Sequence, residues 1–458
     1  MGHVAVIDIG KTNAKLALVR LSDLSEIAVV TRPNTVLPGP PYPHFDVDGH
    51  WEFILEGLSR FHVEFGIDAI TVTTHGASGA LIAADGSLAA PILDYEHTGP
   101  DDSAKAYDAI RPPFSETGSP RLSMGLNLGA QLHWQFATDP GLRERVAHVV
   151  TYPQFWAHKL SGVLATDVTS LGCHTDIWKP YESQFSSLPM ALGIAGKIAP
   201  PRKPGDLLGP VTSDVARRTG LPPKTPVYCG IHDSNASLLS HLVARKPPFS
   251  VVSTGTWVIA MAVGRKPVTL DPRRDTLVNV NAFGDAVPSA RFMGGREHDL
   301  VLDGSAVGAD SAEMLQVLSQ RCMLLPAVVP ETGPFAGTRA RWVGEEPPLG
   351  SGARTAAVGF YLALVTFHCL ELIGHEGPVI VEGPFAKNLA YLMMLGAASH
   401  SPIIPTASAT GTSEGAALLV AQDDSPRYRA PALPVPDTRM SEALSSYASA
   451  WNDSLAKA

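Results

Sequence analysis

A carboxylate stands at a point in the sequence where it could act as a general base. Asp233 lies in "YCGIHDSNASLLSHL" (228–242), between an apolar, strand-like run and the start of a helix rich in small residues. A carboxylate here can cap the helix by accepting backbone N–H bonds from the first turn. It can also take the proton of a substrate hydroxyl, if other groups hold that substrate beside it. The local sequence leaves both roles open.

Two polar loops that contain glycine could bind phosphate groups. The first is "DIGKTNAK" (8–15) and the second is "VSTGTW" (252–257), and each is flanked by apolar runs. Glycine lets the backbone approach an anion closely, and polar side chains can donate to it. Neither loop is a Walker loop or a GxGxxG motif, so an ordinary hairpin turn is the alternative for each. The candidate ligands in the first loop are Gly10, Thr12 and Asn13, and Lys11 or Lys15 could add positive charge. Those in the second loop are Ser253, Thr254, Gly255 and Thr256.

The two loops begin the two halves of the chain, so together they could clamp one polyphosphate. Asp8 leads from a strand pattern into the first loop, and a carboxylate beside phosphates commonly serves a magnesium ion or its waters. If Asp233 ends the first half, it lies near the same polyphosphate. It could then accept the proton of a hydroxyl that attacks a phosphoryl group. The residues therefore favour phosphoryl transfer.

The patterns around these residues predict an α/β protein. Strand patterns occur at 4–9, 16–19 and 69–74, and helical spacing of apolar residues occurs at 50–65 and 152–162. We expect the first strands to form a hairpin around the first polar loop. These elements would position the loop and the carboxylates at strand ends.

A chain of 458 residues is too long for one ordinary core, which predicts two domains of roughly 200 residues each. The proline-containing stretch 244–249 interrupts the pattern, and a second strand, glycine turn and strand follow it. This repeat suggests a duplicated α/β unit. We place the boundary near residue 245, with domains 1–244 and 245–458.

Composition excludes several partners. The net charge is -9 and the basic residues are scattered, so no basic stripe is available for nucleic acid. The four cysteines are far apart without metal-ligand spacing, which is typical of reduced thiols in the cytoplasm. No export signal is recognised at the N-terminus. The apolar segment 356–373 contains His368 and Glu371, so we interpret it as a buried core helix and expect no membrane partner.

An ordered set of motifs resembles a known family. The set is "DIGKTNAK", "TTHGASGAL", "HDSNASL", "STGTW" and "ATGTSEGAAL", and it runs from residue 4 to about 420. In this order it is similar to the FGGY carbohydrate kinases of the sugar kinase/Hsp70/actin superfamily, and most similar to their L-fuculokinase and rhamnulokinase branch. The resemblance implies two ribonuclease H-like lobes of the actin-like ATPase type, with mixed sheets flanked by helices and a cleft between them. It implies ATP and Mg2+ as cofactors.

The resemblance also assigns roles to individual positions. Asp233 matches the catalytic base, and Asp8 matches a carboxylate that acts on the metal through water. The segment 411–418 matches a helix start that closes the second domain around the nucleotide. The implied cofactor-binding residues are Asp8, Gly10, Thr12, Asn13, Lys15, Ser253, Thr254, Gly255, Thr256, Gly383 and Asn388, and the implied substrate-binding residues are Thr74, His75, Gly76, Asp94, His232 and Asp233.

Three departures from the family pattern affect specificity. Ala77 and Ser78 stand where the branch has an aspartate that meets the sugar. In the adenine loop "VEGPFAKN" (381–388), Glu382 and Pro384 occupy glycine places, and proline removes an amide donor. The segment "LDYEHT" (93–98) replaces the family's usual Trp-x-x-x-Arg type pattern, so Asp94, Glu96 and His97 could supply polar contacts in a different arrangement. Apart from these departures, the cluster "MGGREHD" (293–299) is open between a polar turn and a nucleotide or phosphate role.

We therefore expect a cytoplasmic, ATP-dependent kinase that phosphorylates a terminal hydroxyl of a small ketose or polyol, with L-fuculose as the first candidate. A sensor that binds sugar or nucleotide without turnover is the alternative, because the adenine loop is altered. An ATPase of the actin or Hsp70 type is disfavoured, since those proteins lack an "HD"-type acid before a small-residue helix. A homodimer stays open.

Overall fold

The structure is a computed structural model, and it describes residues 2–264, 267–406, 411–421 and 437–456. The described chain divides into two compact units. The first contains residues 2–245, 278–286 and 411–421, and the second contains 246–264, 267–277, 287–406 and 437–456. The first break falls at Arg245, next to the boundary that the linker suggested. The return of two later segments to the first unit differs from the two continuous domains expected from the sequence.

The sheet of the first unit is mixed. Its strand order is β13-β14-β6-β1-β2-β3, and β15 also pairs with β6. Strands β1, β2 and β3 are antiparallel neighbours, whereas β6 runs parallel to β1 and to β14 and β15. The strands are β1 (His3–Ile9), β2 (Asn13–Arg20), β3 (Ser25–Pro33), β6 (Ala69–Thr74), β13 (Leu207–Pro210), β14 (Pro226–Tyr228) and β15 (Ile231–His232); shorter pairings join β4 (Val36–Leu37) to β5 (His44–Phe45), β7 (Gly79–Ile82) to β8 (His148–Thr151), β9 (Thr166–Asp167) to β12 (Pro201–Arg202), and β10 (Trp178–Lys179) to β11 (Gln184–Phe185).

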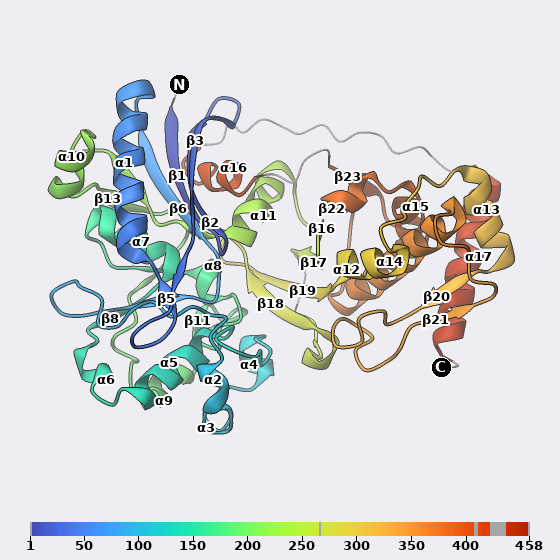
Figure 1. Ribbon diagram of the computed structural model, residues 1–458, viewed down its shortest axis with the longest axis horizontal. Helices are drawn as coiled ribbons and strands as arrows, with labels where there is room; N and C mark the ends of the chain where they lie inside the picture. The colour runs from blue at the N-terminus through green and yellow to red at the C-terminus, as the bar shows by residue number, and fades with distance from the viewer. Residues whose placement is uncertain (1, 265–266, 407–410, 422–436, 457–458) are drawn as a thin grey trace. The chain divides into compact units, whose positions relative to one another are not determined.

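Helices cover both faces of this sheet (Figure 1). Helices α1 and α7 pack on one face, where apolar residues of β1, β2 and β6 form a core with them. Helices α11 and α16 lie at the other face and contact each other, β1 and β6. The longer helices are α1 (Val47–Phe65), α5 (Leu128–Thr138), α7 (Tyr152–Ser161), α10 (Ser213–Thr219), α11 (Asp233–Ala244) and α16 (Thr412–Ala417); the short ones are α2 (Gly99–Asp102), α3 (Ala104–Asp108), α4 (Phe114–Thr117), α6 (Leu142–Arg145), α8 (Val168–Leu171) and α9 (Leu188–Ala191).

The second unit has a mixed sheet with the order β18-β19-β17-β16-β22-β23. Strands β16 and β17 form an antiparallel hairpin, and β22 runs parallel to both β16 and β23. Part of this order repeats the first sheet: β23-β22-β16-β17-β19 correspond to β14-β6-β1-β2-β3, whereas β18 and β13 have no counterparts. The strands are β16 (Phe249–Thr254), β17 (Val258–Val263), β18 (Thr276–Val280), β19 (Ala286–Phe292), β22 (Val379–Glu382) and β23 (Ile403–Pro405), and β20 (Met323–Leu325) pairs separately with β21 (Arg341–Val343).

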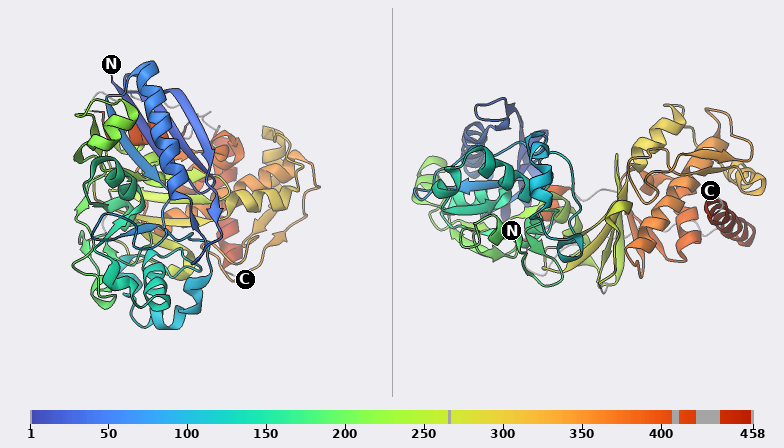
Figure 2. Two further views of the ribbon diagram at one scale, coloured as in Figure 1. Left: turned by 60° about the vertical axis from the view of Figure 1, so that its left-hand side comes forward. Right: turned by 90° about the horizontal axis from the view of Figure 1, so that it is seen from below.

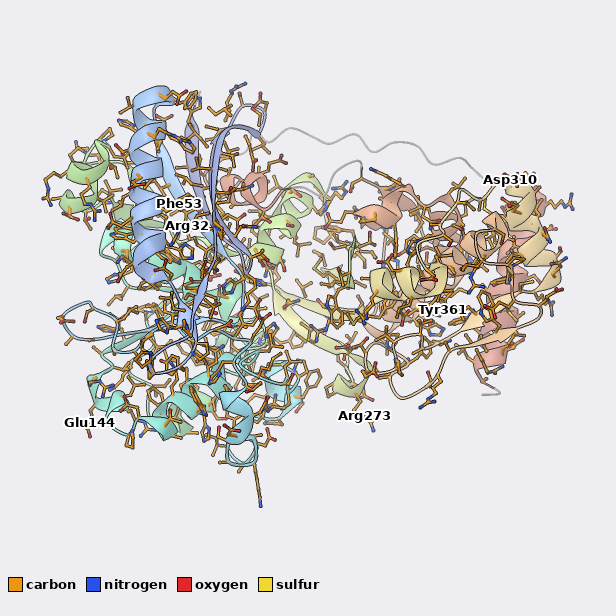
Figure 3. All side chains as sticks on the ribbon, viewed as in Figure 1. Arg32, Phe53, Glu144, Arg273, Asp310 and Tyr361 are labelled. Atoms are coloured by element: carbon orange, nitrogen blue, oxygen red, sulfur yellow. The ribbon has the colours of Figure 1, made fainter. Side chains whose placement is uncertain are left out.

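The core of the second unit forms around one long helix, α14 (Gly352–Leu372). It packs against α15 (Leu389–Ser399) and α13 (Ser311–Gln320), while α17 (Thr438–Leu455), dark red in Figure 2, packs on α13 and α15. Asp310 begins α13 with a capping box, and Tyr361 of α14 donates to buried Glu297 at 2.8 Å (Figure 3). The remaining helices are α12 (Gly294–Leu302), η1 (Pro272–Arg274) and η2 (Pro384–Lys387).

Helix α14 is long and apolar enough to cross a membrane by length and composition, the one such helix within the described ranges. However, 72% of its apolar window is buried inside the protein. The predicted core helix at 356–373 is therefore confirmed. The predicted strands at 4–9, 16–19 and 69–74 and the predicted helices at 50–65 and 152–162 are confirmed as well, within one or a few residues at their ends.

The domain that the resemblance implied for 411–418 needs correction. Helix α16 belongs to the first unit, where it packs on α11, β1 and β6. Gly415 makes this approach feasible, because a Cβ there would lie 1.9 Å from the carbonyl oxygen of Ala236 in α11. The helix therefore belongs to the first unit and not to the second domain, while its predicted role in closure around the nucleotide stays a prediction.

Candidate active site

Three parallel strand ends meet at one edge of the first sheet. Ile9 at the end of β1 and His232 at the end of β15 both pair with Thr74 at the end of β6. Because the strands are parallel, the residues that follow them emerge on the same side. This topology brings Asp8, His75 and Asp233 into one neighbourhood, although they are far apart in the sequence.

Asp233 is the first residue of α11, and His232 occupies the N-cap position without a side-chain capping bond. The carboxylate Oδ1 of Asp233 accepts from the backbone N–H of Ser234 at 2.6 Å and lies 3.2 Å from His232 Nε2. Every contact of this carboxylate within the described chain uses Oδ1, and its side chain is 32% exposed. The carboxylate thus supports the first turn and leaves Oδ2 for another partner.

A buried pair stands behind this carboxylate. The sulfur of Cys173 lies 3.7 Å from His232 Nε2, and the other ring nitrogen of His232 lies 3.2 Å from the side-chain nitrogen of Asn235. Burial alone would lower the pKa of His232, but the nearby Cys173 and Asp233 raise it to about 10. The raised pKa favours a protonated ring beside Asp233. Gly76 packs on this ring, because a Cβ there would lie 2.7 Å from His232 Nε2.

Asp8 is a partly buried carboxylate near Asp233. Burial raises the pKa of Asp8 to about 6; Lys15 opposes the shift, whereas the charge of Asp233 adds to it. Lys15 also forms an ion pair with Glu26 at 2.7 Å, so its charge is shared between two carboxylates. Two nearby acids at a strand edge attract a cation, and this arrangement suits a divalent metal ion with its waters.

His75 presents a buried nitrogen with no partner among the described residues. Its ring lies between Phe45, Tyr95 and Tyr152, with centroid distances of 5.1 Å to each. Nδ1 donates to the carbonyl oxygen of Gly76 at 2.8 Å, and burial lowers the pKa to about 4. A neutral ring whose proton is on Nδ1 has an acceptor lone pair on Nε2, and that atom is buried and unbonded here.

The polar contacts near His75 involve an ion-pair cluster. Lys11 forms ion pairs with Asp94 and with Glu96, the latter at 3.0 Å, and its ammonium lies 4.6 Å from the Tyr95 ring centroid. Lys11, a residue of the first loop, is therefore held by the two acids of the segment 94–96. Asp94 is buried. The first loop itself is the turn of the predicted hairpin, where Gly10 donates to the Asn13 carbonyl oxygen at 2.9 Å.

Among the other predicted residues of this edge, one is buried and two are exposed. Thr74 is buried and its hydroxyl donates to the carbonyl oxygen of His75 at 2.9 Å, so this hydroxyl shapes the loop. Thr12 and Asn13 are exposed at the hairpin turn. Ser78 keeps a buried hydroxyl for which the described chain supplies no partner.

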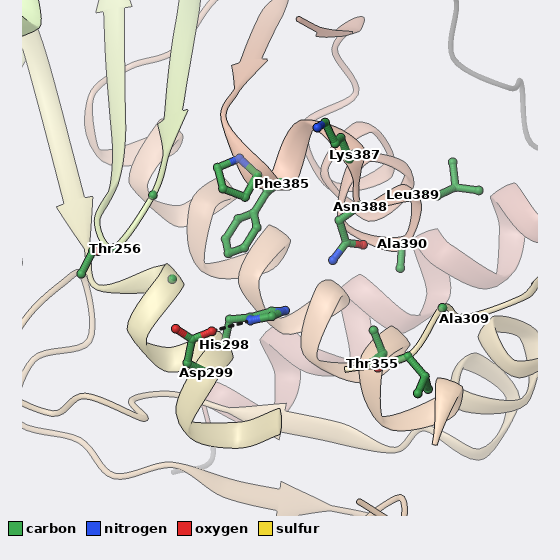
Figure 4. A pocket seen from close by; sticks show the side chains of 15 residues that line it. Thr256, His298, Asp299, Ala309, Thr355, Phe385, Lys387, Asn388, Leu389 and Ala390 are labelled. Carbon is green, nitrogen blue, oxygen red and sulfur yellow. Dashed lines mark hydrogen bonds and ion pairs between the residues drawn. The ribbon is translucent and has the colours of Figure 1, made fainter. Parts of the chain in front are cut away.

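In the second unit, the β16–β17 hairpin turn opens onto a cavity of about 650 Å³ (Figure 4). Gly255 and Thr256 of the turn line it, together with Asn388, whose Oδ1 caps α15 by accepting from Tyr391 N at 3.1 Å. The Phe385 ring lies 5.8 Å from the ring of His298, between centroids. The volume and the aromatic wall suit a nucleoside-sized ligand.

Thr254 and Gly383 support the cavity from behind. The Thr254 hydroxyl donates to the Glu382 carbonyl oxygen at 2.5 Å and accepts from Phe385 N at 3.1 Å, so it joins the two strand ends. Gly383 has φ 83, and a Cβ there would lie 1.9 Å from the Thr254 carbonyl oxygen. Neither residue lines the cavity. The predicted contacts of Thr254 with phosphate and of Gly383 with the nucleotide stay predictions.

Helix α12 supplies residues whose role the sequence left open. Gly295, His298 and Asp299 of "MGGREHD" line the same cavity. His298 Nδ1 lies 3.0 Å from the Asp299 carboxylate (Figure 4). A Cβ on Gly295 would lie 2.1 Å from the Gly255 carbonyl oxygen, so the helix start and the hairpin turn pack backbone to backbone. A paired glycine at a helix start was the only local signal of this contact.

The fold and the two sets of residues define a class of protein, the kinases built on two ribonuclease H-like units. The model of one protein family, carbohydrate kinase FGGY, C-terminal domain, matches residues 246–428. A solved structure of a carbohydrate kinase from Novosphingobium aromaticivorans is 34% identical, with a TM-score of 0.92, and the alignment covers 100% of this chain and 99% of that one. The chain belongs to the FGGY family of carbohydrate kinases.

Other similarities are more partial. An L-fuculokinase of Salmonella typhi is 29% identical over 207 residues, which cover 44% of this chain and 43% of that protein. The chain therefore spans less than half of the length of that curated relative. A Plasmodium falciparum glycerol kinase with ADP is 13% identical over 100% of this chain and 98% of that one, with a TM-score of 0.77, and shows the fold alone.

Proposed function

We propose that the protein transfers the γ-phosphoryl group of ATP to a terminal hydroxyl of a small ketose or polyol. One observation carries the proposal: Asp233 stands at the edge where three parallel strands end, with one carboxylate oxygen bound to its own helix and the other available. Family membership supports the reaction class. We further propose a cytoplasmic location, with no nucleic-acid or membrane partner.

In the proposed reaction, Asp233 Oδ2 accepts the proton of the acceptor hydroxyl as its oxygen attacks the γ-phosphorus. A new P–O bond forms, the bond to the β-phosphate oxygen breaks, and ADP leaves. His232 Nε2, 3.2 Å from Oδ1, holds the carboxylate in place. Gly10, Thr12, Asn13, Gly255 and Thr256 are the proposed contacts for the phosphates, and the cavity beside Asn388 is the proposed site of the nucleoside.

Asp8 is the proposed magnesium residue. Within the described ranges no group of three or more His, Cys, Asp or Glu side chains could hold a metal by itself. Mg2+ in kinases is held by one or two carboxylates and by substrate phosphates, so a single carboxylate fits. A cation beside Asp8 would favour its charged form, which burial disfavours. When bound, the ion would neutralise charge on the phosphates.

The edge near His75 favours a neutral, hydroxylated acceptor. His75 Nε2 and the Ser78 hydroxyl are both buried without a partner among the described residues, and sugar hydroxyls could bond to both. The acids of this edge, Asp8, Glu26, Asp94, Glu96 and Asp233, outnumber its basic groups, which are Lys11, Lys15 and His232. An acidic sugar would be repelled. L-fuculose is our first candidate, and a panel of neutral ketoses and polyols is the corresponding test.

The deciding experiment replaces the base. Asp233→Asn should keep sugar and nucleotide affinity but lower turnover by about 10²-fold or more, because a general base contributes on that scale. Asp214→Asn is the matched control, since Asp214 is also an acid in the first turn of a helix. Near-normal turnover in Asp233→Asn, with lowered thermal stability, would instead assign the residue to helix support alone.

A sensor without turnover is the second candidate, because Pro384 lines the cavity where an amide donor could otherwise stand. Measurable binding of ATP and a sugar, with no phosphorylated product across the whole panel, would favour it. Product formation with any member of the panel would exclude it.

A further inference from the structure

A second cavity, of about 480 Å³, lies in the second unit beside the first. Its floor is apolar and includes Leu324, Ala327 and Val328. Three arginines and a tryptophan line the rest of it: Arg339, Arg341, Arg354 and Trp342. No acidic side chain belongs to this lining within the described ranges. None of these residues takes part in the proposed phosphoryl transfer.

The three arginines differ in how far they are engaged. Arg354 is held in place: it donates to Glu346 at 2.7 Å and to the Val301 carbonyl oxygen at 3.0 Å, and its guanidinium lies 5.5 Å from the Trp342 ring centroid. Arg339 and Arg341 are exposed, and Arg341 makes only a long contact of 3.5 Å to a backbone oxygen. Two guanidiniums are therefore available at the mouth of an apolar cavity.

This combination selects a type of ligand. Guanidinium groups bind phosphates and carboxylates with two parallel hydrogen bonds, and an indole face and aliphatic floor favour a flat apolar body. An inorganic ion would leave the floor uncovered, and an uncharged apolar molecule would leave the arginines unused. The ligand should combine both features.

The two cavities share two helices. His298 and Asp299 of α12 line the first cavity, whereas Leu300 and Val301 line the second. On α14, Thr355 faces the first cavity and its neighbour Arg354 faces the second. The bond from Arg354 to the Val301 carbonyl oxygen ties the helices together. A ligand that moves Arg354 therefore also moves α12, and α12 lines the first cavity.

We propose that the second cavity binds a small organic anion, a phosphate or carboxylate on a flat apolar body, and that its occupancy changes the affinity of the first cavity for nucleotide. The coupling, but not the anion site itself, rests on the proposed function of the first cavity. Coupling between binding sites is reciprocal, so nucleotide changes the affinity for the anion by the same factor.

The binding test uses 1-naphthyl phosphate with the full-length protein in isothermal titration calorimetry, in the presence of saturating non-hydrolysable ATP analogue. The Arg339→Ala/Arg341→Ala double variant should bind at least about 10-fold more weakly, as expected for the loss of charge-assisted hydrogen bonds. Arg439→Ala is the matched control, because Arg439 is an exposed arginine of the same unit outside the cavity. Neutral 1-naphthol should bind much more weakly than the phosphate.

Equal affinity of the double variant and the wild-type protein, or equal binding of 1-naphthol, would overturn the site.

The coupling test measures affinity for the ATP analogue with and without 1-naphthyl phosphate. We expect a change of about 5-fold or more, absent in the double variant. An unchanged affinity would overturn the coupling. Failure to phosphorylate any sugar would count against the kinase proposal but leave 1-naphthyl phosphate binding intact.

Discussion

The backbone contact between Gly255 and Gly295 allows a sharp test of the nucleotide cavity. A Cβ at position 295 would lie 2.1 Å from the Gly255 carbonyl oxygen, whereas ordinary van der Waals contact begins at 3.4 Å. The helix start and the hairpin turn must therefore separate by about 1 Å in Gly295→Ala. Both segments are backbone, so no side-chain rotation can relieve the clash.

The expected effect follows from this displacement. A shift of about 1 Å in a positioning element can cost about 10²-fold, which corresponds to about 2.7 kcal/mol. We expect Gly295→Ala to weaken binding of an ATP analogue, and to lower kcat/KM for ATP, by about that factor. Affinity for the sugar should not change, because its proposed residues belong to the first unit.

The assay is calorimetric binding of the ATP analogue and of the sugar, with thermal unfolding to check that the variant folds. Gly308→Ala is the matched control: Gly308 lines the same cavity, and a Cβ there would meet nothing within 4 Å. It should bind nucleotide normally. Normal nucleotide affinity in a folded Gly295→Ala protein would refute the assignment of this cavity to nucleotide.

Three further predictions concern the first unit. His75→Phe keeps a ring in the aromatic pocket but removes Nε2. The KM for the sugar should therefore rise about 10-fold or more, while the KM for ATP stays constant. An unchanged KM for the sugar would remove His75 from the site. Lys11→Met removes the cation from the buried Asp94 and should lower the free energy of unfolding by about 1 to 2 kcal/mol in denaturant titration, because the pair is only partly buried. A loss below about 0.5 kcal/mol would show that the pair is solvated. The folded pKa of Asp8, about 6, is above its unfolded value of 3.8, so its contribution to stability is full below pH 3.8 and is lost as the pH rises through 6. Asp8→Asn should therefore gain thermal stability relative to wild type between pH 4 and pH 7 in the absence of magnesium, and a pH-independent difference would contradict the raised pKa.

Much of the fold could be predicted from local patterns. Alternating and β-branched runs around "DIGKTNAK" and "VSTGTW" gave both hairpins, because a short glycine turn between apolar runs leaves few other structures. Asp233 could be placed at a strand-to-helix corner for the same reason. His232, and not Asp233, holds the N-cap position, so Asp233 supports the first turn from within the helix through Oδ1, and Oδ2 stays available for the proposed general-base role.

Long-range packing could not be predicted. The paired glycine at the start of α12 does not say that Gly295 meets Gly255. No local pattern indicates that the hydroxyl of Thr254 joins two strand ends instead of facing a ligand. Lys11 was one of two lysines that could have served phosphate, and its pairing with Asp94 depends on a segment more than eighty residues away. These contacts join residues that are distant in the sequence, so no local pattern in a single sequence reveals them.

The return of α16 to the first unit has a consequence for how the protein is made. During synthesis, α11 with Asp233 leaves the ribosome long before α16, which later covers α11, β1 and β6. Until then, the face of the sheet beside the proposed base lacks its helix. The face of the sheet beside the proposed base can therefore be fully covered only after α16 has been translated, so a truncated product that ends before α16 would leave part of that face exposed although it contains every residue of the edge.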